Sequence, residues 1–559
     1  MKIGYFPDKH IGNNVTSFLQ EHATNQPDRV ALYYPSKKLF DGDTIVHDRI
    51  TYSQLNQSGA SFAYGLQQQG VSRGDRILLF LPISVEFYIS IAGIQRMGAI
   101  PVLLESAARI EQIDAIVKNA KPVGIVSNGE ALQLFSALLD MHRISIRIST
   151  TDVEKGITKF TDLLTDCLQD IVAVGQHDTA LITYTTGSSG TPKGADRTHR
   201  FLAAQHYALK RLFPYHDTDI DLPVFPVFAL NNIASGIQTV LPAIDVSRPT
   251  PNDTRILLSQ IQACGVNSMT LAPSSFRTMA HYCKTNTITL STMRRVLTGG
   301  APISETDIAT FVEIAPHCQS WILYGSTEVE PIATIESREM LAALPQREGG
   351  NITEIGVNVG KIDPELTAKF ITIDPNPIPI GIDITTIAVK DGAVGELIVT
   401  GEHVCRAYYN NDEAFLRAKI KDTNENIWHR TGDLGRQDTD GYLWIVGRVH
   451  NVVEHHGEYF FPVRCEIMLK DLPHVINAAY VGIDENGQQS IIAVVTLEPD
   501  VATDTQYQTD VRNTILALFE NSHIPLDRVF FMENIPMDVR HHSKVNYFLL
   551  RQQLHELLA

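Results

Sequence analysis

Closely spaced cysteine pairs are missing from this sequence of 559 residues. No two of the six cysteines have a CxxC spacing; they are Cys167, Cys264, Cys283, Cys318, Cys405 and Cys465. This spacing argues against a zinc cluster and indicates no disulfide framework.

Positive charge is also scarce. The 46 Lys and Arg residues are outnumbered by 63 Asp and Glu residues, which gives a formal net charge of −17. A chain this acidic is a poor candidate for wrapping nucleic acid or coating an anionic membrane. Nucleic acid is therefore not an expected partner. Small anionic ligands remain compatible with this charge, because local hydrogen-bond donors can overcome a global field.

An uninterrupted apolar run of membrane-spanning length is missing as well. The most apolar region, 77–104, is interrupted by Glu86, Gln95 and Arg96 and by two prolines. This pattern indicates buried α/β structure and not a transmembrane segment. Residues 1–10 lack the apolar core of a secretion signal. The expected protein is therefore cytoplasmic and has no transmembrane segment.

The sequence does contain a stretch rich in glycine and hydroxyl groups, YTTGSSGTPKG at 184–194, directly after an apolar run. Glycines let backbone N–H groups approach a ligand, and the hydroxyls and the lysine add donors for phosphate oxygens. A flexible linker is the alternative, but a linker does not usually follow a strand. The stretch is not a Walker A loop, because Pro192 precedes Lys193. We expect it to bind a nucleotide phosphate.

Strand and helix patterns alternate along the first part of the chain. Apolar runs of strand length at 76–81, 98–104 and 123–127 are separated by helical spacing at 84–97 and 110–119. The alternation resumes after the glycine-rich stretch and predicts parallel sheets covered by helices.

Three predicted strands run into glycines, at Gly187, Gly299 and Gly325. In open α/β sheets, ligands gather outside the carboxyl ends of the strands. The three strand ends are therefore expected to face one crevice.

The pattern changes from about residue 356, where turn-bounded strands such as 395–401 and 441–447 predict a small β-barrel or an antiparallel sheet. After Val449, strands and helices alternate over about a hundred residues, enough for a small α+β domain. The predicted fold is α/β. A large N-terminal domain, 1–449, contains two parallel-type sheets and a small β-barrel, and a small α+β domain, 450–559, follows it.

Several motifs occur in order along the chain. They are YTTGSSGTPKG, YGSTE at 324–328, GELIVTG at 395–401, TGDL at 431–434, GR at 447–448 and a single Lys544. Together they resemble the adenylate-forming superfamily of acyl-CoA synthetases, peptide-synthetase adenylation domains and luciferases. Further segments are similar to the β-lactone synthetases of bacterial olefin biosynthesis, a branch with many relatives called fatty-acid CoA ligases. These segments are 221–230, 418–422, 428–434, 461–466 and 536–544.

The resemblance implies an ATP site assembled from these motifs. The stretch 185–193 would hold the pyrophosphate end, and Tyr324 would offer a flat face to adenine. Asp433 would accept hydrogen bonds from both ribose hydroxyls, and Arg448 would contact ribose or phosphate. The implied cofactor-binding residues are Thr185, Thr186, Gly187, Ser188, Ser189, Gly190, Thr191, Lys193, Gly300, Ala301, Tyr324, Gly325, Ser326, Thr327, Asp433 and Arg448.

The resemblance also implies three catalytic residues: Lys544, Thr185 and Glu328. Glu328 would bind Mg2+ with help from Thr185, because this ion prefers carboxylate, phosphate and water oxygens. The ammonium of Lys544 would bridge the acyl carboxylate and the α-phosphate. In this superfamily a mobile C-terminal domain rotates after adenylation about a hinge just past the GR pair. That position is His450 here, where Asp or Lys is usual.

The expected substrate-binding residues are Phe225, Phe228 and Ala229. Acyl-CoA synthetases commonly have His at the position of Ala229, and a small apolar residue would leave an opening for a hydrocarbon chain. The same aromatic residues, with Ile233 and Met269, would line that opening. Ordinary core packing is the alternative interpretation of these residues.

The resemblance implies activation of a long-chain (3-hydroxy) fatty acid by ATP and Mg2+, with pyrophosphate release and subsequent β-lactone formation. The alternative is an AMP-forming fatty acyl-CoA ligase, which would use CoA. Loading of a carrier protein in trans and a silent nucleotide-binding homologue are further alternatives. A catalytically silent homologue is disfavoured because four motif residues are present together: Lys544, Glu328, Asp433 and Arg448. Other enzymes of a lipid or natural-product pathway are conceivable partners.

Overall fold

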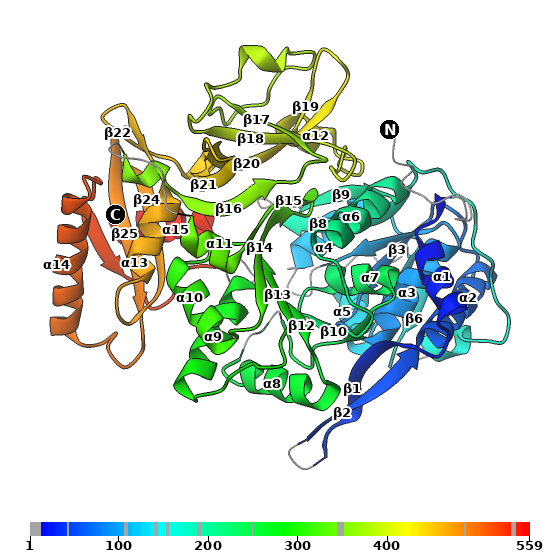
Figure 1. Cartoon of the computed structure of the whole chain (residues 1–559). Coiled ribbons are helices and arrows are strands. Elements are labelled where there is room, and N and C mark those ends of the chain that lie inside the picture. The colour runs from blue at the N-terminus through cyan, green and yellow to red at the C-terminus, as the bar shows by residue number, and fades with distance from the viewer. Residues whose placement is uncertain are drawn as a thin grey trace.

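The structure is a computed structural model that describes residues 13–41, 44–104, 110–138, 144–151, 156–186, 192–246, 248, 250–343, 351–485, 488–537 and 544–558. The protein is a mixed α/β protein with a large sheet-containing domain and a smaller C-terminal domain, as predicted (Figure 1). No helix in these ranges is both long and apolar enough to cross a membrane.

A seven-stranded sheet occupies one side of the large domain, with the strand order β7-β6-β5-β3-β4-β8-β9. The strands run parallel except β9, which pairs antiparallel with β8 at the edge of the sheet. The inner strands are continuous apolar runs because helices cover the sheet. The elements are β3 Arg76–Phe80, α3 Val85–Arg96, β4 Ile100–Leu103, α4 Ile110–Ala120, β5 Gly124–Ser127, α5 Gly129–Leu138, β6 Ile146–Ser149, β7 Thr158–Lys159, β8 Thr179–Thr186 and β9 Pro192–Thr198.

The second sheet has fourteen strands in the described ranges. Its first half is mostly parallel, from β1 through β11, β10, β12 and β13 to β14, and β2 pairs antiparallel with β1 at the edge. The elements of this half are β1 Val30–Asp41, β2 Thr44–Thr51, β10 Ile220–Pro223, β11 Gln238–Val240, β12 Ser268–Leu271, β13 Arg295–Gly299 and β14 Gln319–Ser326.

The second half of this sheet is antiparallel and covers the region where the sequence predicts a small β-barrel. The order β14-β15-β16-β21-β20-β18-β17 is open in the described ranges, and β19 pairs with β20. The strands extend the existing sheet and do not close on themselves, because β16 pairs with β15. The elements are β15 Val329–Glu336, β16 Val357–Ile362, β17 Thr367–Ile371, β18 Gly395–Thr400, β19 Lys419–Lys421, β20 Ile427–Gln437 and β21 Tyr442–Arg448.

Local sequence signals explain where several helices begin. Thr51 and Gln54 form a capping box at the start of α2, and the Thr198 side chain accepts a hydrogen bond from Phe201 N in α6. Helices α7 and α9 begin with proline, which lacks the N–H that a first turn leaves unpaired. The remaining helices of the large domain are α1 Thr16–Asn25, α2 Tyr52–Gln68, α6 His199–Leu212, α7 Pro226–Ser235, α8 Asp253–Cys264, α9 Pro273–Thr285, α10 Glu305–Ile314, α11 Ser337–Ala342 and α12 Asp412–Ala418.

In the described part of the C-terminal domain, three helices pack around a three-stranded sheet, and α13 docks the domain onto the large one (Figure 1). Val463 and Ile467 of α13 belong to the main core of the large domain, and Arg464 pairs with Glu305 at 3.4 Å. The 449/450 boundary and the mobility of this domain stay predictions. The elements are β22 Val453–His455, β23 Glu458–Phe460, α13 Pro462–Lys470, β24 Val475–Glu485, β25 Gln488–Leu497, α14 Thr505–Asn521, β26 Arg528–Phe531 and α15 Tyr547–Leu558.

Candidate active site

The glycine-rich stretch connects the antiparallel strands β8 and β9. Thr185 is paired with Lys193 and Thr186 with Pro192, so both predicted flanks lie side by side. Lys193 is half-buried, and burial lowers its pKa although the Glu328 carboxylate opposes that change. The five predicted phosphate-binding residues between the flanks lie outside the described residues; they are Gly187, Ser188, Ser189, Gly190 and Thr191.

Glycines bring the carboxyl ends of β13 and β14 close together. Gly299 is paired with Leu323, and a Cβ atom on Gly299 would lie only 2.0 Å from the Leu323 carbonyl oxygen. Gly300 follows with a φ of +97°, a conformation that favours glycine. Gly300 and Ala301 therefore leave β13 beside Tyr324, where the sequence predicts the adenine site.

Tyr324, Asp433 and Arg448 come from three different strands and are in direct contact. The Tyr324 hydroxyl donates to Asp433 Oδ2 at 2.7 Å, and Arg448 Nε donates to Asp433 Oδ1 at 2.9 Å. The register of β20 and β21 places Asp433 opposite Arg448. Burial, followed by the Asp433 charge, raises the pKa of Tyr324, and the same carboxylate raises the pKa of Arg448. The hydroxyl and the guanidinium thus hold one carboxylate in a fixed orientation.

Glu328 lies in the tight turn between β14 and β15, where Ser326 is paired with Val329. Its backbone N–H donates to Ser326 Oγ at 3.2 Å, and its Oε1 accepts from the Tyr408 hydroxyl at 2.8 Å. Burial by itself would raise the pKa of Glu328, but His429, Lys419 and the Tyr408 hydroxyl lower it to about 2. The side chain is therefore an anionic carboxylate at neutral pH, as a metal ligand requires.

The neighbouring turn residues are held by the backbone and by one buried arginine. Gly325 has no room for a side chain, because a Cβ atom there would lie 2.9 Å from the Val329 carbonyl oxygen. Arg197 donates to the Thr327 carbonyl oxygen through Nε at 3.2 Å and Nη2 at 2.7 Å. Arg197 comes from β9, so it joins the YGSTE turn to the strand that carries Lys193.

A buried pair, Lys419 and His429, lies beside Glu328 and was not singled out in the sequence. The two residues are paired between β19 and β20, and Lys419 Nζ lies 3.2 Å from His429 Nδ1. Burial and the adjacent ammonium lower the pKa of His429 to about 3, and burial lowers the pKa of Lys419. Both residues are buried in strands that are mostly polar in sequence, KIK and IWHRTGDLGRQ, so the sequence contained no signal that distinguished them.

Lys544 is half-buried in the segment before α15, next to the bridge between Met537 and Val545. In the helix that follows, Arg551 Nη2 of α15 donates to the His450 carbonyl oxygen at 3.0 Å. Burial lowers the pKa of His450, and nearby cations that include Arg430, Arg551 and Lys193 lower it further. The predicted hinge residue therefore lies among the cations of the site.

An apolar cavity of about 110 Å³ lies between α1, α3, α6 and α7. Phe228 and Ile233, two of the residues predicted to line an opening for an acyl chain, are among its lining residues; that this cavity holds an acyl chain stays a prediction. Ala229 is fully buried in the adjoining core, and Met269 belongs to the core beneath β12. Phe225 packs with Phe228 in a small cluster that includes Leu297 and Leu323. Phe228 of the cavity wall thus packs against residues of β13 and β14.

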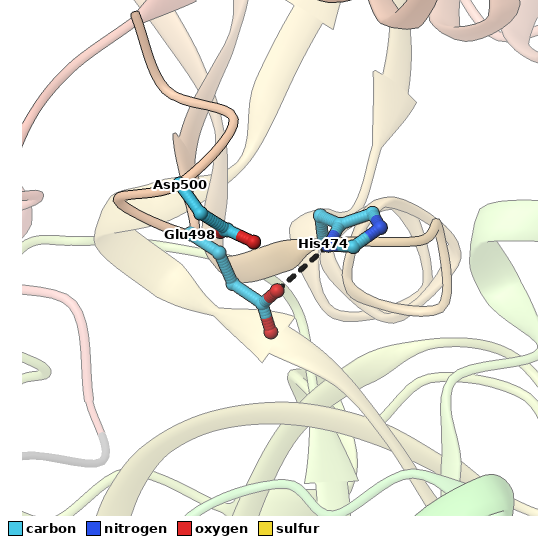
Figure 2. A group of neighbouring side chains, drawn as sticks. All are labelled: His474, Glu498 and Asp500. Atoms are coloured by element: carbon cyan, nitrogen blue, oxygen red, sulfur yellow. Dashed lines mark hydrogen bonds and ion pairs between the residues drawn. The ribbon is translucent and has the colours of Figure 1, made fainter.

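A group of exposed side chains in the C-terminal domain, His474, Glu498 and Asp500, also has its ligand atoms within 4.8 Å of one another (Figure 2). His474 Nδ1 lies 2.7 Å from Glu498 Oε2. The register explains this contact, because Val475 is paired with Leu497 and the two residues flank that pair. We interpret the group as a surface hydrogen bond between neighbouring strands, and we assign no metal to it.

The architecture is that of the adenylate-forming enzymes. O-succinylbenzoate coenzyme A synthetase from Bacillus subtilis, solved in complex with ATP and a magnesium ion, superposes with a TM-score of 0.72 at 19% identity, covering 96% of this chain and 99% of that one. Residues 19–409 match the AMP-binding enzyme family, and the chain belongs to this family.

Two curated relatives cover nearly the whole chain. An olefin beta-lactone synthetase of Xanthomonas campestris is 28% identical over 549 residues, 95% of this chain and 96% of that enzyme. The long-chain-fatty-acid–CoA ligase FadD13 of Mycobacterium tuberculosis is 23% identical over 545 residues, 97% of this chain and 98% of that enzyme. These are the two branches that the sequence motifs resemble.

Proposed function

We propose that this enzyme activates a long-chain 3-hydroxy fatty acid with ATP, releases pyrophosphate and then closes the acyl-adenylate to a β-lactone. The observation that carries the proposal is the convergence of separate motifs on one place. Arg197 of β9 binds the Thr327 carbonyl oxygen, and Tyr324 at the end of β14 binds Asp433. The hairpin, the end of β14 and the Asp433–Arg448 pair are therefore joined although they are far apart in the sequence. This arrangement suits a nucleotide lying across the strand ends.

Asp433 is the proposed ribose ligand. Tyr324 and Arg448 hold its two oxygens, which leaves the carboxylate rigid, and a carboxylate oxygen can accept more than one hydrogen bond. Gly300 and Ala301 provide the space for adenine next to the Tyr324 ring. Thr185, Thr186 and Lys193 are the described residues proposed to contact the phosphates, together with the backbone of 325–327.

The residues around Glu328 fit a magnesium ion. The carboxylate is anionic, with a pKa of about 2, and the Tyr408 hydroxyl holds one of its oxygens. Carboxylate and phosphate oxygens are ligands that Mg2+ prefers, and Thr185 is the proposed second protein ligand. Bound Mg2+ would neutralise charge on the phosphates during their transfer.

In the proposed first step, a carboxylate oxygen of the fatty acid attacks the α-phosphorus, and the bond to the bridging oxygen of pyrophosphate breaks. Lys544 is proposed to lie between the carboxylate and the α-phosphate, where its charge offsets the added negative charge. In the second step, the 3-hydroxyl oxygen attacks the acyl carbon, AMP leaves and the hydroxyl proton is released. The bond that forms closes a four-membered lactone.

The cavity supports an acyl chain that carries polar groups. Most of its wall is aliphatic or aromatic, which suits a hydrocarbon chain. Polar side chains also reach it, and Gln205 Nε2 donates to Glu330 Oε2 at 3.4 Å within this wall. Glu330 is two residues beyond Glu328, so this polar part of the wall lies toward the reacting end. A hydroxyl on the chain can hydrogen-bond to such groups.

The first test measures product formation with and without CoA. With ATP, Mg2+ and a long-chain 3-hydroxy acid, we expect many pyrophosphates per enzyme without CoA, and mass spectrometry should detect the β-lactone. The matched control is the same acid without its hydroxyl. This acid lacks the intramolecular nucleophile, so pyrophosphate release should stop after about one turnover per enzyme. Turnover that requires CoA and yields a thioester would contradict the lactone proposal and favour the ligase alternative.

The second test fills the cavity. Ala234→Phe places a ring in the apolar wall, and we expect turnover of a sixteen-carbon 3-hydroxy acid to fall by about tenfold or more, a typical effect of pocket shape. Turnover of a four-carbon 3-hydroxy acid should change little, because that acid does not reach the cavity. Ala342→Phe on the exposed end of α11 is the control. Equal losses for both acids would show that the cavity does not hold the chain.

A further inference from the structure

A buried ammonium group braces the segment that holds Glu328. Lys419 is only 2% exposed, and its Nζ donates to the Cys405 carbonyl oxygen. The backbone N–H of the same Cys405 donates to the Glu328 carbonyl oxygen at 2.7 Å. Two hydrogen bonds, with Cys405 as the single intervening residue, therefore link Lys419 to the Glu328 backbone.

A second line of contacts runs through Tyr408. Lys419 Nζ lies 5.4 Å from the centre of the Tyr408 ring, a cation–π distance, and the Tyr408 hydroxyl donates to Glu328 Oε1 at 2.8 Å. The Lys419 ammonium thus contacts both Cys405, which binds the Glu328 backbone, and Tyr408, which binds the Glu328 carboxylate.

The 405–408 segment has little regular structure of its own to fix it. It lies between β18 and α12 and forms no strand of its own; isolated bridges, Ala195 with Tyr408 and Val329 with the adjacent Val404, and the hydrogen bond from Asp196 N to the Ala407 carbonyl oxygen attach it to the sheets. A segment of this kind needs side-chain contacts to hold one conformation. Lys419 supplies such a contact from β19, which is paired with β20 of the large sheet.

The cost of burial argues that the charge has a use. Taking an ammonium out of water is expensive, and apolar residues of similar volume often pack as well or better. Here the charge is close enough to an anionic carboxylate to lower the pKa of that group, and its electric field is strong because the ammonium is buried. An aliphatic side chain could fill the space, but it would neither bind the Cys405 carbonyl nor attract the carboxylate.

We propose that Lys419 is a positioning residue that acts on Glu328 through Cys405 and Tyr408 and so prepares the carboxylate for Mg2+ bound with ATP. This inference rests on the proposed function, in which Glu328 binds the metal. His429 completes the arrangement by packing against the ammonium at 3.2 Å. The effect of Lys419 is therefore expected on the metal-dependent part of nucleotide binding, and not on nucleotide binding as such.

The experiment is calorimetric titration with α,β-methylene ATP, which is not cleaved, in Mg2+ and in EDTA. We expect the unaltered protein to bind the nucleotide more tightly in Mg2+ than in EDTA, and we call the ratio of the two affinities the Mg2+ enhancement. In Lys419→Met this ratio should be about tenfold smaller, while the affinity in EDTA is unchanged. The control is Arg96→Met, which removes another buried cation. The Arg96 side chain lies on α3 and donates to the Gln169 carbonyl oxygen, so this variant should keep the enhancement.

A double-mutant cycle with Tyr408→Phe tests the proposed line of contacts. Tyr408→Phe should lower the Mg2+ enhancement too, and Lys419→Met should have a smaller effect in that background, because both act on one carboxylate. An unchanged enhancement in Tyr408→Phe, or in a folded Lys419→Met, overturns the inference. Absence of any Mg2+ enhancement in the unaltered protein overturns the proposed metal site itself, which separates the two failures.

Discussion

Lys544→Ala is expected to lower acid-dependent ATP–pyrophosphate exchange by about a hundredfold to a thousandfold, the usual loss when one charge-stabilising donor is removed from a transition state. The ammonium is proposed to meet the carboxylate and the α-phosphate only as the new bond forms. Binding of ATP itself depends on other residues, so its dissociation constant should change by less than about threefold. Radiolabelled pyrophosphate exchange and calorimetry measure the two quantities separately.

Two variants control the Lys544 experiment. Lys284→Ala removes a lysine that is exposed on α9 and pairs with Glu313, and it should leave exchange unchanged. Lys544→Arg keeps the charge but changes its shape and should recover only part of the activity, because a planar guanidinium replaces a compact ammonium. Full exchange in Lys544→Ala would remove this residue from the mechanism.

Asp433→Asn is expected to weaken ATP binding by about tenfold to a hundredfold, since hydrogen bonds to a charged group contribute roughly 1.5–3 kcal/mol. The amide keeps the size of the carboxylate but has one acceptor oxygen in place of two. It also loses the charge that pairs with Arg448 at 2.9 Å. Calorimetric titration with ATP gives the affinity directly.

Tyr324→Phe separates ribose binding from simple support of Asp433. This variant removes the hydroxyl that donates to Asp433 at 2.7 Å but keeps the ring and the carboxylate. A smaller loss than in Asp433→Asn is expected if the carboxylate itself binds ribose. Asp440→Asn changes an exposed carboxylate in the turn before β21 and serves as the surface control. Equal losses in Tyr324→Phe and Asp433→Asn would mean that Asp433 acts only by holding Tyr324.

The family and the α/β fold were predictable because their signals are local. Alternating apolar runs predict the parallel strands, and glycines mark where β13 and β14 approach each other. The order of the short motifs matches the adenylate-forming superfamily, and the AMP-binding enzyme family match, residues 19–409, covers the first three of them. These features depend on residue type and spacing, which are visible without coordinates.

The antiparallel region shows where the local pattern was insufficient. Turn-bounded strands such as β18 and β21 are compatible with both a barrel and an open sheet, because each strand alternates in the same way. The outcome depended on the pairing of β16 with β15, which continues the large sheet. Such pairing joins residues far apart in the sequence and has no local signature.

The sequence by itself determined the set of chemical groups: a carboxylate in YGSTE, another in TGDL, a lysine near the end and a glycine-rich connection that is proposed to bind phosphate. Only the tertiary structure decided which groups touch, since Asp433 meets Tyr324 and Arg448 across three strands. It also placed Lys419, His429 and Tyr408 around Glu328, which no spacing indicated. The physical reason is that burial and charge act through space, and strand pairing sets the distances.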